Sequence, residues 1–168
     1  MEHSWASRFV VFERDEGTDA GLAEELRMGQ PRVFEHAFTV SPKDIDRLGH
    51  VNNVVYLRYA QDAAVAHWHS AVDQEHRESL VWVVRRHEID YLKPAVENDG
   101  LVARTWIDDA SGATMERFIE IRRQRDGEIL ARVRSVWVAL DAKTLRPRRV
   151  TAELRSLFLE AGEELPAA

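Results

Sequence analysis

The segment DIDRLGHVNN, residues 44–53, gathers side chains that can move protons or attack a polarised bond. Two aspartates stand one residue apart, Asp44 and Asp46, and Gly49, His50 and two asparagines follow them. A long apolar run then begins, so the segment leads directly into a predicted helix. A carboxylate just ahead of a helix lies beside unpaired backbone N–H groups and the positive end of the helix dipole.

An acid next to a helix N-terminus suits reactions of a carbonyl group. The free N–H groups can bind the carbonyl oxygen, and losing one such donor typically costs about 3 kcal/mol of activation barrier. Asp46 would attack the carbonyl carbon or take a proton from water. Gly49 would allow close approach of the backbone, and Asn52 and Asn53 would begin the helix. The alternative is that Asp44, Asp46 and Asn52 only form turns and caps, where Asp and Asn are favoured. Spacing alone leaves both interpretations open.

The apolar run predicts a long helix over residues 51–72. Its polar side chains share one arc of the helix, at Arg58, Gln61, Asp62 and His69. Most of the remaining surface is apolar, so we expect the helix to be buried on most sides. The helix is also rich in small side chains, at Ala60, Ala63, Ala64, Ala66 and Ala71. Such side chains let another backbone approach closely, so we expect a sheet curved around a helix roughly 30 Å long.

Five β-strands are predicted from alternating or β-branched runs. They cover residues 32–40, 80–92, 101–107, 113–125 and 128–140. Asp126 and Gly127 form a strong two-residue hairpin signal between the last two strands. A short helix over residues 151–162 follows. The order of a strand, a helix and four antiparallel strands predicts the α+β class rather than a parallel sheet.

Length, charge and composition narrow the function classes. The chain has 168 residues, which suits one domain with a proper core. We expect residues 1–31, with a short helix over Ala20–Met28, to be an N-terminal extension of a domain over residues 32–168. The net charge of −6 argues against nucleic acid as the main partner. Cysteine, a secretory signal and a membrane-spanning apolar run are all missing from the sequence, so we expect a cytoplasmic protein without a membrane span.

The stretch FTVSPKDIDRLGHVNNVVYLRYAQDA resembles the signature of the hotdog-fold acyl-CoA thioesterases of the 4-hydroxybenzoyl-CoA thioesterase and YbgC/FadM-like group. The shared pattern is an Asp-x-Asp, a Gly or Gln before His-Val-Asn-Asn, and a Tyr three residues on. It is matched here by Asp44, Asp46, Gly49, His50, Val51, Asn52, Asn53 and Tyr56. Two later stretches, VVRRHEIDYLKPAVENDGLVARTWI and DGEILARVRSVWVALDAKTLRPRRV, resemble the rest of that core, so the resemblance covers about residues 32–159.

The resemblance implies a hotdog fold, in which an antiparallel β-sheet wraps around a long central α-helix. It implies that Asp46 is the catalytic carboxylate and that the backbone N–H of Asn53 polarises the thioester carbonyl. His50 matches a histidine that is also present in plant acyl-ACP thioesterases, where a neighbouring Asn takes part. That position is Leu48 here, which leaves His50 between a catalytic and an architectural role. Residues expected to contact substrate are Gly49, Asn52, Tyr56, Val55 and Tyr59.

The implied activity is hydrolysis of an acyl-CoA thioester to a free carboxylic acid and CoA, with acyl-CoA or acyl carrier protein as the bound partner. No metal and no redox cofactor is implied. Members of the group associate through their sheets with sites at subunit interfaces, so we expect a homodimer or homotetramer. The alternative function is a catalytically weak hotdog subunit that binds acyl-CoA or acyl carrier protein. A hotdog dehydratase is disfavoured because its Gly-His-Phe-Pro-Gly pattern is replaced by Gly-His-Val-Asn-Asn.

Other polar residues have structural alternatives. Asp62 is a second candidate nucleophile, since a related hotdog group takes its carboxylate from the central helix, but it could instead pair with Arg58. His67 and His69 point about 200° apart on a helix, which disfavours a shared metal. The arginine clusters are expected to be solvated faces or a cradle for the phosphates of CoA; they are Arg122, Arg123 and Arg125, and Arg146, Arg148 and Arg149. A strand trio, Arg85, Arg86 and His87, is expected to be structural or to lie at a rim.

Overall fold

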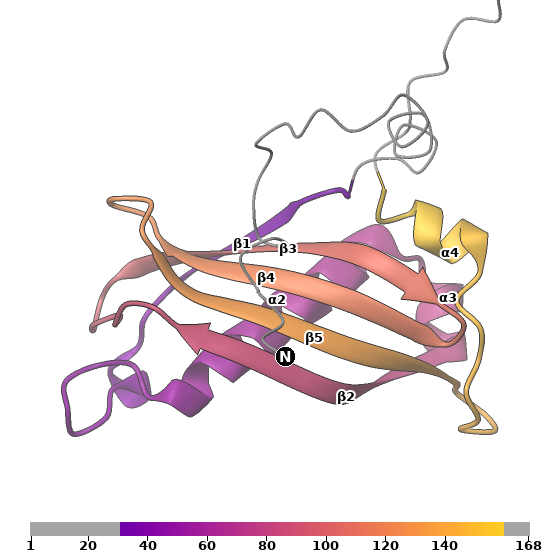
Figure 1. Cartoon of the computed structure of the whole chain (residues 1–168), viewed down its shortest axis with the longest axis horizontal. Coiled ribbons are helices and arrows are strands. Elements are labelled where there is room, and N and C mark those ends of the chain that lie inside the picture. Colours follow the sequence, from indigo (N-terminus) through magenta and orange to yellow (C-terminus); the bar gives the residue numbers. More distant parts are fainter. Residues whose placement is uncertain (1–30, 160–168) are drawn as a thin grey trace, which may run out of the picture.

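Helix α2, Asn53–Ala71, lies across one face of a five-stranded antiparallel sheet (Figure 1). The computed structural model describes residues 31–159. Its strands are β1 (Phe34–Thr39), β2 (Leu80–Tyr91), β3 (Gly100–Ser111), β4 (Thr114–Arg123) and β5 (Ile129–Asp141). They are ordered β1-β3-β4-β5-β2, and every pair is antiparallel. The predicted α+β class and hotdog fold are confirmed.

Three short helical elements complete the described chain. They are the 3-10 turn η2 (Pro42–Asp44), α3 (Gln74–Ser79) and α4 (Ala152–Ser156). Helix α4 occupies only the start of the predicted 151–162 helix, and strand β3 runs four residues beyond its predicted end at residue 107. The predicted N-terminal extension, with its helix over Ala20–Met28, lies outside the described residues except for Pro31. No helix in the described part of the chain is long and apolar enough to cross a membrane.

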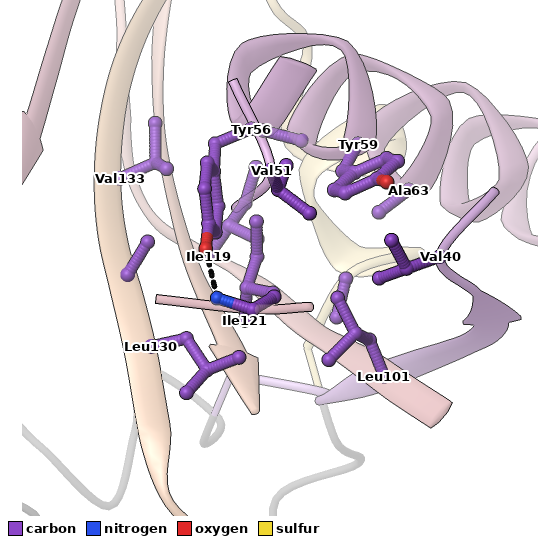
Figure 2. Packing of buried hydrophobic residues seen from close by; sticks show 14 residues of the cluster. Val40, Val51, Tyr56, Tyr59, Ala63, Leu101, Ile119, Ile121, Leu130 and Val133 are labelled. Atoms are coloured by element: carbon purple, nitrogen blue, oxygen red, sulfur yellow. Dashed lines mark hydrogen bonds between the residues drawn. The ribbon is translucent and has the colours of Figure 1, made fainter. Parts of the chain in front are cut away.

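The alanines of α2 do permit close packing against the sheet. Ala60 and Ala63 are almost completely buried, and they join a core cluster with Leu101 and Ile119 on the inner face of β3 and β4. Figure 2 shows how these side chains meet between helix and strands. Tyr56 is anchored in the same cluster, because its hydroxyl accepts a hydrogen bond of 3.0 Å from the backbone N–H of Ala95.

The prediction that α2 is buried on most sides is wrong. The sheet covers one side of the helix, where the buried residues are Tyr56, Tyr59, Ala60, Ala63, Ala64 and His67. On the opposite side Val54 is 72% exposed and Val65 is 41% exposed. The physical reason is that the described residues supply only one layer against this helix, so its second apolar side has nothing to pack on.

A second core cluster lies at the far end of α2. It joins Val72, Leu80, Ile107, Met115 and Ala139 with Leu154 and Phe158 from the α4 region. The sheet has two edges, β1 and β2. Strand β2 is the longer edge, and three valines on it, Val81, Val83 and Val84, are between 37% and 41% exposed.

Candidate active site

The loop before α2 is closed by hydrogen bonds around Asp46. The backbone N–H of Asp46 donates to the carbonyl of His50 at 2.9 Å, and the N–H of Gly49 donates to the carbonyl of Asp46 at 3.0 Å. Gly49 has a φ of 79°, a left-handed conformation that glycine adopts without strain. Asp46 Oδ1 accepts the N–H of Leu48 at 2.8 Å. The other carboxylate oxygen, Oδ2, accepts no hydrogen bond from the described residues.

Asn52 fixes where the helix begins. Its side-chain Oδ1 accepts the N–H of Val54 at 3.0 Å, and its backbone carbonyl accepts the N–H of Val55 at 2.9 Å. Asn52 is therefore an N-cap residue, as the structural alternative held. The N–H of Asn53, the first residue of α2, has no partner among the described residues, so it remains available at the positive end of the helix.

Asp44 has a structural position, in contrast to Asp46. Its side chain is 4% exposed, and it accepts hydrogen bonds from Arg58 and, at 2.8 Å, from the hydroxyl of Tyr59. Burial alone would raise the pKa of Asp44, but the bonds from Arg58 and Tyr59 outweigh it and hold this pKa below its usual value. The predicted pairing of Arg58 with Asp62 is wrong, because the loop brings Asp44 to Arg58 instead.

One pocket is lined by half of the predicted site residues. It is lined by Asp46, His50, Asn53 and Tyr56, with Leu48 and Val51 from the same loop, and Tyr91, Leu92, Lys93 and Pro94 from the end of β2. Its volume is about 240 Å³. The loop and the strand end meet here because the N–H of Val51 donates to the carbonyl of Ala95 at 2.9 Å and the hydroxyl of Tyr91 donates to the carbonyl of Asn53.

The remaining predicted residues do not line this pocket. Gly49 and Asn52 shape the backbone of the loop and of the helix start. Val55 is half-buried against the core. Tyr59 lines a different pocket with Asp62, next to β1. The carboxylate of Asp62 therefore opens to a different pocket from that of Asp46, and the two candidates occupy separate places.

Tyr91 was missed at the sequence level. Its hydroxyl donates to the carbonyl of Asn53 at 3.0 Å, which ties the end of β2 to the start of α2, and burial raises its pKa. Its ring also meets Tyr56 edge-on, with centroids 5.6 Å apart. The available signal was its position two residues before Lys93-Pro94, where the strand must end beside another element.

The two arginine clusters lie at opposite ends of the sheet. Arg122 and Arg123 end β4, near the pocket, whereas Arg146, Arg148 and Arg149 follow β5. The first cluster is paired with acids: Arg122 with Glu120 at 2.6 Å, Arg123 with Asp126 at 2.8 Å and Arg125 with Asp99 at 3.1 Å. Of the strand trio, His87 lies 2.8 Å from the Ser135 hydroxyl and Arg86 pairs with Glu88. Within residues 31–159, no cluster of three or more acidic and histidine side chains is arranged to hold a metal.

Comparison with known proteins identifies the family and the fold. The sequence model described as the thioesterase-like superfamily matches residues 40–158, which is most of the chain. Among curated relatives, the palmitoyl-acyl carrier protein thioesterase of Gossypium hirsutum chloroplasts is 24% identical over 142 residues. That alignment covers 77% of this chain and 34% of the relative, so the chain spans about a third of that protein's length.

Solved structures show the same fold. The 1,4-dihydroxy-2-naphthoyl-CoA thioesterase of Synechocystis aligns with a TM-score of 0.67 at 18% identity, covering 75% of this chain and 95% of its own. A thioesterase of Thermus thermophilus, solved with coenzyme A and Zn, aligns with a TM-score of 0.64 at 26% identity. That alignment covers 74% of this chain and 90% of the other.

Proposed function

Because the chain belongs to the thioesterase-like superfamily, we propose that it hydrolyses an acyl-CoA thioester to a free carboxylic acid and CoA. The observation that carries the proposal is the meeting of Asp46, His50 and Asn53 in one pocket at the start of α2. Among residues 31–159, this pocket offers a carboxylate with one oxygen free of hydrogen bonds and an unpaired N–H group at the positive end of a 19-residue helix. A similar fold solved with coenzyme A supports the substrate class.

In the proposed reaction, the carbonyl oxygen of the thioester accepts a hydrogen bond from the N–H of Asn53. As general base, Asp46 takes a proton from water, whose oxygen attacks the carbonyl carbon. As nucleophile, Asp46 attacks that carbon itself, and water then hydrolyses the mixed anhydride. In both routes the C–S bond breaks, the sulfur of CoA leaves as a thiol after gaining a proton, and the N–H stabilises the charge on the oxygen.

His50 has two proposed roles that the same loop permits. Its backbone carbonyl accepts the N–H of Asp46, which holds the loop closed, and its side chain lines the pocket. Replacing His50 by Ala leaves the backbone bond in place. A loss of turnover in His50→Ala would therefore assign the side chain to the reaction, whereas unchanged turnover would assign His50 to the architecture of the loop.

We also propose that two copies associate through the β2 edge. A 12-residue edge strand with three exposed valines offers unpaired backbone groups and apolar surface to a second strand. Antiparallel pairing of two β2 strands would bring the Tyr91 end of one copy, and hence its candidate site, toward the Val81 end of the other. The site would then be completed at the subunit interface.

Release of free thiol tests the activity. The assay uses short, medium, long and aromatic acyl-CoA esters, together with an acyl-carrier-protein ester, and the protein adds no thiol of its own. We expect turnover of at least one ester and a loss of about 100-fold or more in Asp46→Asn. Asp62→Asn is the matched control, since it removes the same charge from the same helix region outside the pocket.

Three outcomes separate the candidates. Equal activity of wild type and Asp46→Asn, with loss in Asp62→Asn, would transfer the catalytic role to Asp62. Turnover lost only in Asp46→Asn supports the proposal. A wild type that releases no thiol, yet gains thermal stability with acyl-CoA, would be the catalytically weak binding subunit.

A further inference from the structure

Arg117 is a buried cation on the inner face of the sheet. It lies on β4 and is 2% exposed, although its neighbours on that face, Met115 and Ile119, are apolar. Burial lowers the pKa of Arg117 to about 10, so the guanidinium remains charged at neutral pH. An arginine buried in this way normally pairs with a carboxylate, because an uncompensated buried charge is costly.

The hydrogen-bond partners of Arg117 in the described chain are both neutral. Its Nη1 donates to the hydroxyl of Thr105 at 2.9 Å and to Nδ1 of His67 at 3.0 Å. His67 must be uncharged to accept this bond, and burial and Arg117 lower the pKa of His67 to about 3. These two contacts hold the guanidinium in place and leave its positive charge without a counter-ion among residues 31–159.

Arg117 lines a pocket of about 280 Å³ between the second half of α2 and the strands β2, β4 and β5. The walls are apolar and aromatic, and they are formed by Ala64, Val65, Trp68, Leu80, Val81, Trp82, Met115 and Trp137, with Gln61 and His69. Neither aspartate nor glutamate is among the residues that line it. The indole N–H groups of Trp82 and Trp137, two of the lining residues, are buried within the protein and have no hydrogen-bond partner in the described chain.

The pocket therefore contains a cationic hydrogen-bond donor without an anionic acceptor. It presents the guanidinium of Arg117, a cationic donor, between mostly apolar walls, with no carboxylate among its lining residues. Unpaired buried donors each cost free energy, which a ligand that supplies acceptors would recover. Arginine matches the two oxygens of a carboxylate through paired N–H donors, and the tryptophan walls match an apolar chain.

We propose that this pocket binds the far end of the acyl group and selects acyl chains that end in a carboxylate. This assignment rests on the proposed function for the identity of the thioester end. Gln61, the first pocket residue of α2, lies about 12 Å beyond Asn53 at a rise of roughly 1.5 Å per residue. The pocket thus lies along the helix whose N-terminus would hold the thioester carbonyl, at the distance of a medium-length chain.

Calorimetric titration tests the binding part without any turnover. The ligands are monomethyl sebacate, which carries one carboxylate, and dimethyl sebacate, which carries none. Wild type should bind the monomethyl ester, and Arg117→Met should bind it roughly 10- to 100-fold more weakly, because a charge-assisted hydrogen bond is lost. Arg104→Met, which removes an exposed arginine of β3 paired with Glu35, should bind like wild type. Equal binding by wild type and Arg117→Met overturns the inference.

A second measurement uses wild type alone and does not depend on the folding of a variant. Three tryptophans line the pocket, so the monomethyl ester should change indole fluorescence and raise the melting temperature, whereas the dimethyl ester should do neither. Equal responses to both esters would mean that the pocket binds the apolar chain without recognising the carboxylate, which contradicts the inference.

Thiol release then compares sebacoyl-CoA with decanoyl-CoA, which differ only in the terminal carboxylate. Wild type should prefer sebacoyl-CoA in kcat/KM, and Arg117→Met should lose that preference by roughly 10-fold or more. If neither ester is hydrolysed but the monomethyl ester still binds through Arg117, the pocket is right and the proposed function is wrong. If both esters are hydrolysed equally by both proteins, the proposed function stands and the pocket inference fails.

Discussion

The two ends of α2 carry two pockets that are built in opposite ways. At the N-terminal end, Asp46 lies in the loop before α2 and Asn53 begins the helix, and the groups around them form hydrogen bonds with the backbone a few residues away. Along the second half, Arg117 is enclosed by apolar rings and held by Thr105 and His67 from other elements. The first pocket combines a carboxylate with the start of a helix, and the second holds a buried guanidinium that has no carboxylate partner in the described part of the chain.

The difference fits the two roles proposed above, a carboxylate that reacts at the first pocket and a cation that selects the ligand at the second. A carboxylate that must react with water benefits from access to solvent, whereas a cation that must distinguish one ligand end from another benefits from exclusion of water, since electrostatic contacts strengthen in an apolar enclosure. One helix can line both pockets, because its N-terminus has unpaired backbone N–H groups and its middle is covered by the sheet. The following substitutions test this division, beginning with the largest expected effect.

Charges on the β2 edge should disable both pockets at once. Val83→Asp combined with Val84→Asp places two charges on the apolar strand edge that would be buried between two β2 strands, while both positions are exposed in the single chain. Light scattering should show a monomer, and thiol release should fall by about 100-fold or more, because small displacements of a site are that costly.

Ala37→Asp is the control for that experiment, since it places a charge on the other edge strand, β1. It should leave the mass and the turnover unchanged. A double β2 variant that stays oligomeric, or a monomeric one that keeps full turnover, would contradict the interface proposal.

Asp44→Asn should destabilise the loop end without removing the reactive acid. It takes away the charge that Arg58 and Tyr59 contact, so the free energy of unfolding should fall by about 1–3 kcal/mol at pH 7. The pKa of Asp44 is lowered in the fold, so its contribution is present above about pH 4 and is lost as pH falls through that lowered value. Urea unfolding should therefore show a difference in free energy of unfolding between wild type and Asp44→Asn that is smaller at pH 3 than at pH 7. Asp62→Asn changes an exposed position, so its free energy of unfolding should stay close to that of wild type at both pH values.

The two pockets also differ in how far they can be predicted from the sequence. The turn, the cap and the Asp44 contacts at the loop end join residues 2 to 15 positions apart, so DIDRLGHVNN predicts the turn and the helix start. The long apolar run and the Asp126-Gly127 hairpin likewise predict the helix and the sheet. Arg117 lies in ATMERFIEIRRQR, where an arginine between glutamate and phenylalanine is indistinguishable from an exposed strand residue.

Alternation along β4 places Arg117 on the same face as Met115 and Ile119, but it does not show what that face packs against. β4 places Arg117 on the same face as Ile119 and opposite Ile107 of β3, and the helix brings His67 over it from 50 residues away. No local pattern encodes such a meeting. The same holds for Tyr91, whose bond to Asn53 joins residues 38 positions apart. The exposure of Val54 was not predicted for a related reason. The periodicity of the sequence identifies an apolar side of the helix, but it does not show whether a second layer packs against that side.

His67→Gln should change the acid response of the second pocket. Burial holds the pKa of His67 near 3, below its value in an unfolded chain near 6.5. Between these values the unfolded state binds a proton that the folded state does not, so this contribution to stability is complete above pH 6.5 and declines as pH falls toward 3. The stability difference between wild type and His67→Gln should shrink over that window. His69→Gln, two residues on and exposed, should follow the wild-type curve; if it matches His67→Gln instead, the buried pair with Arg117 is not the cause.

Substitution of Asn52 should give the smallest effect. It should also distinguish a capping role of this residue from a direct role in the reaction. Asn52→Ala removes the bond to the N–H of Val54, so the free energy of unfolding should fall by about 1 kcal/mol. The same change lets the first turn of α2 fray, and with it the N–H of Asn53, so turnover should fall modestly. Asn52→Ser restores a capping oxygen but not an amide. If thermal unfolding and thiol release both recover in Asn52→Ser, Asn52 acts through the helix start alone. If stability recovers and turnover does not, the amide itself contacts the substrate, and the loop would carry one more reacting group than its hydrogen bonds indicate.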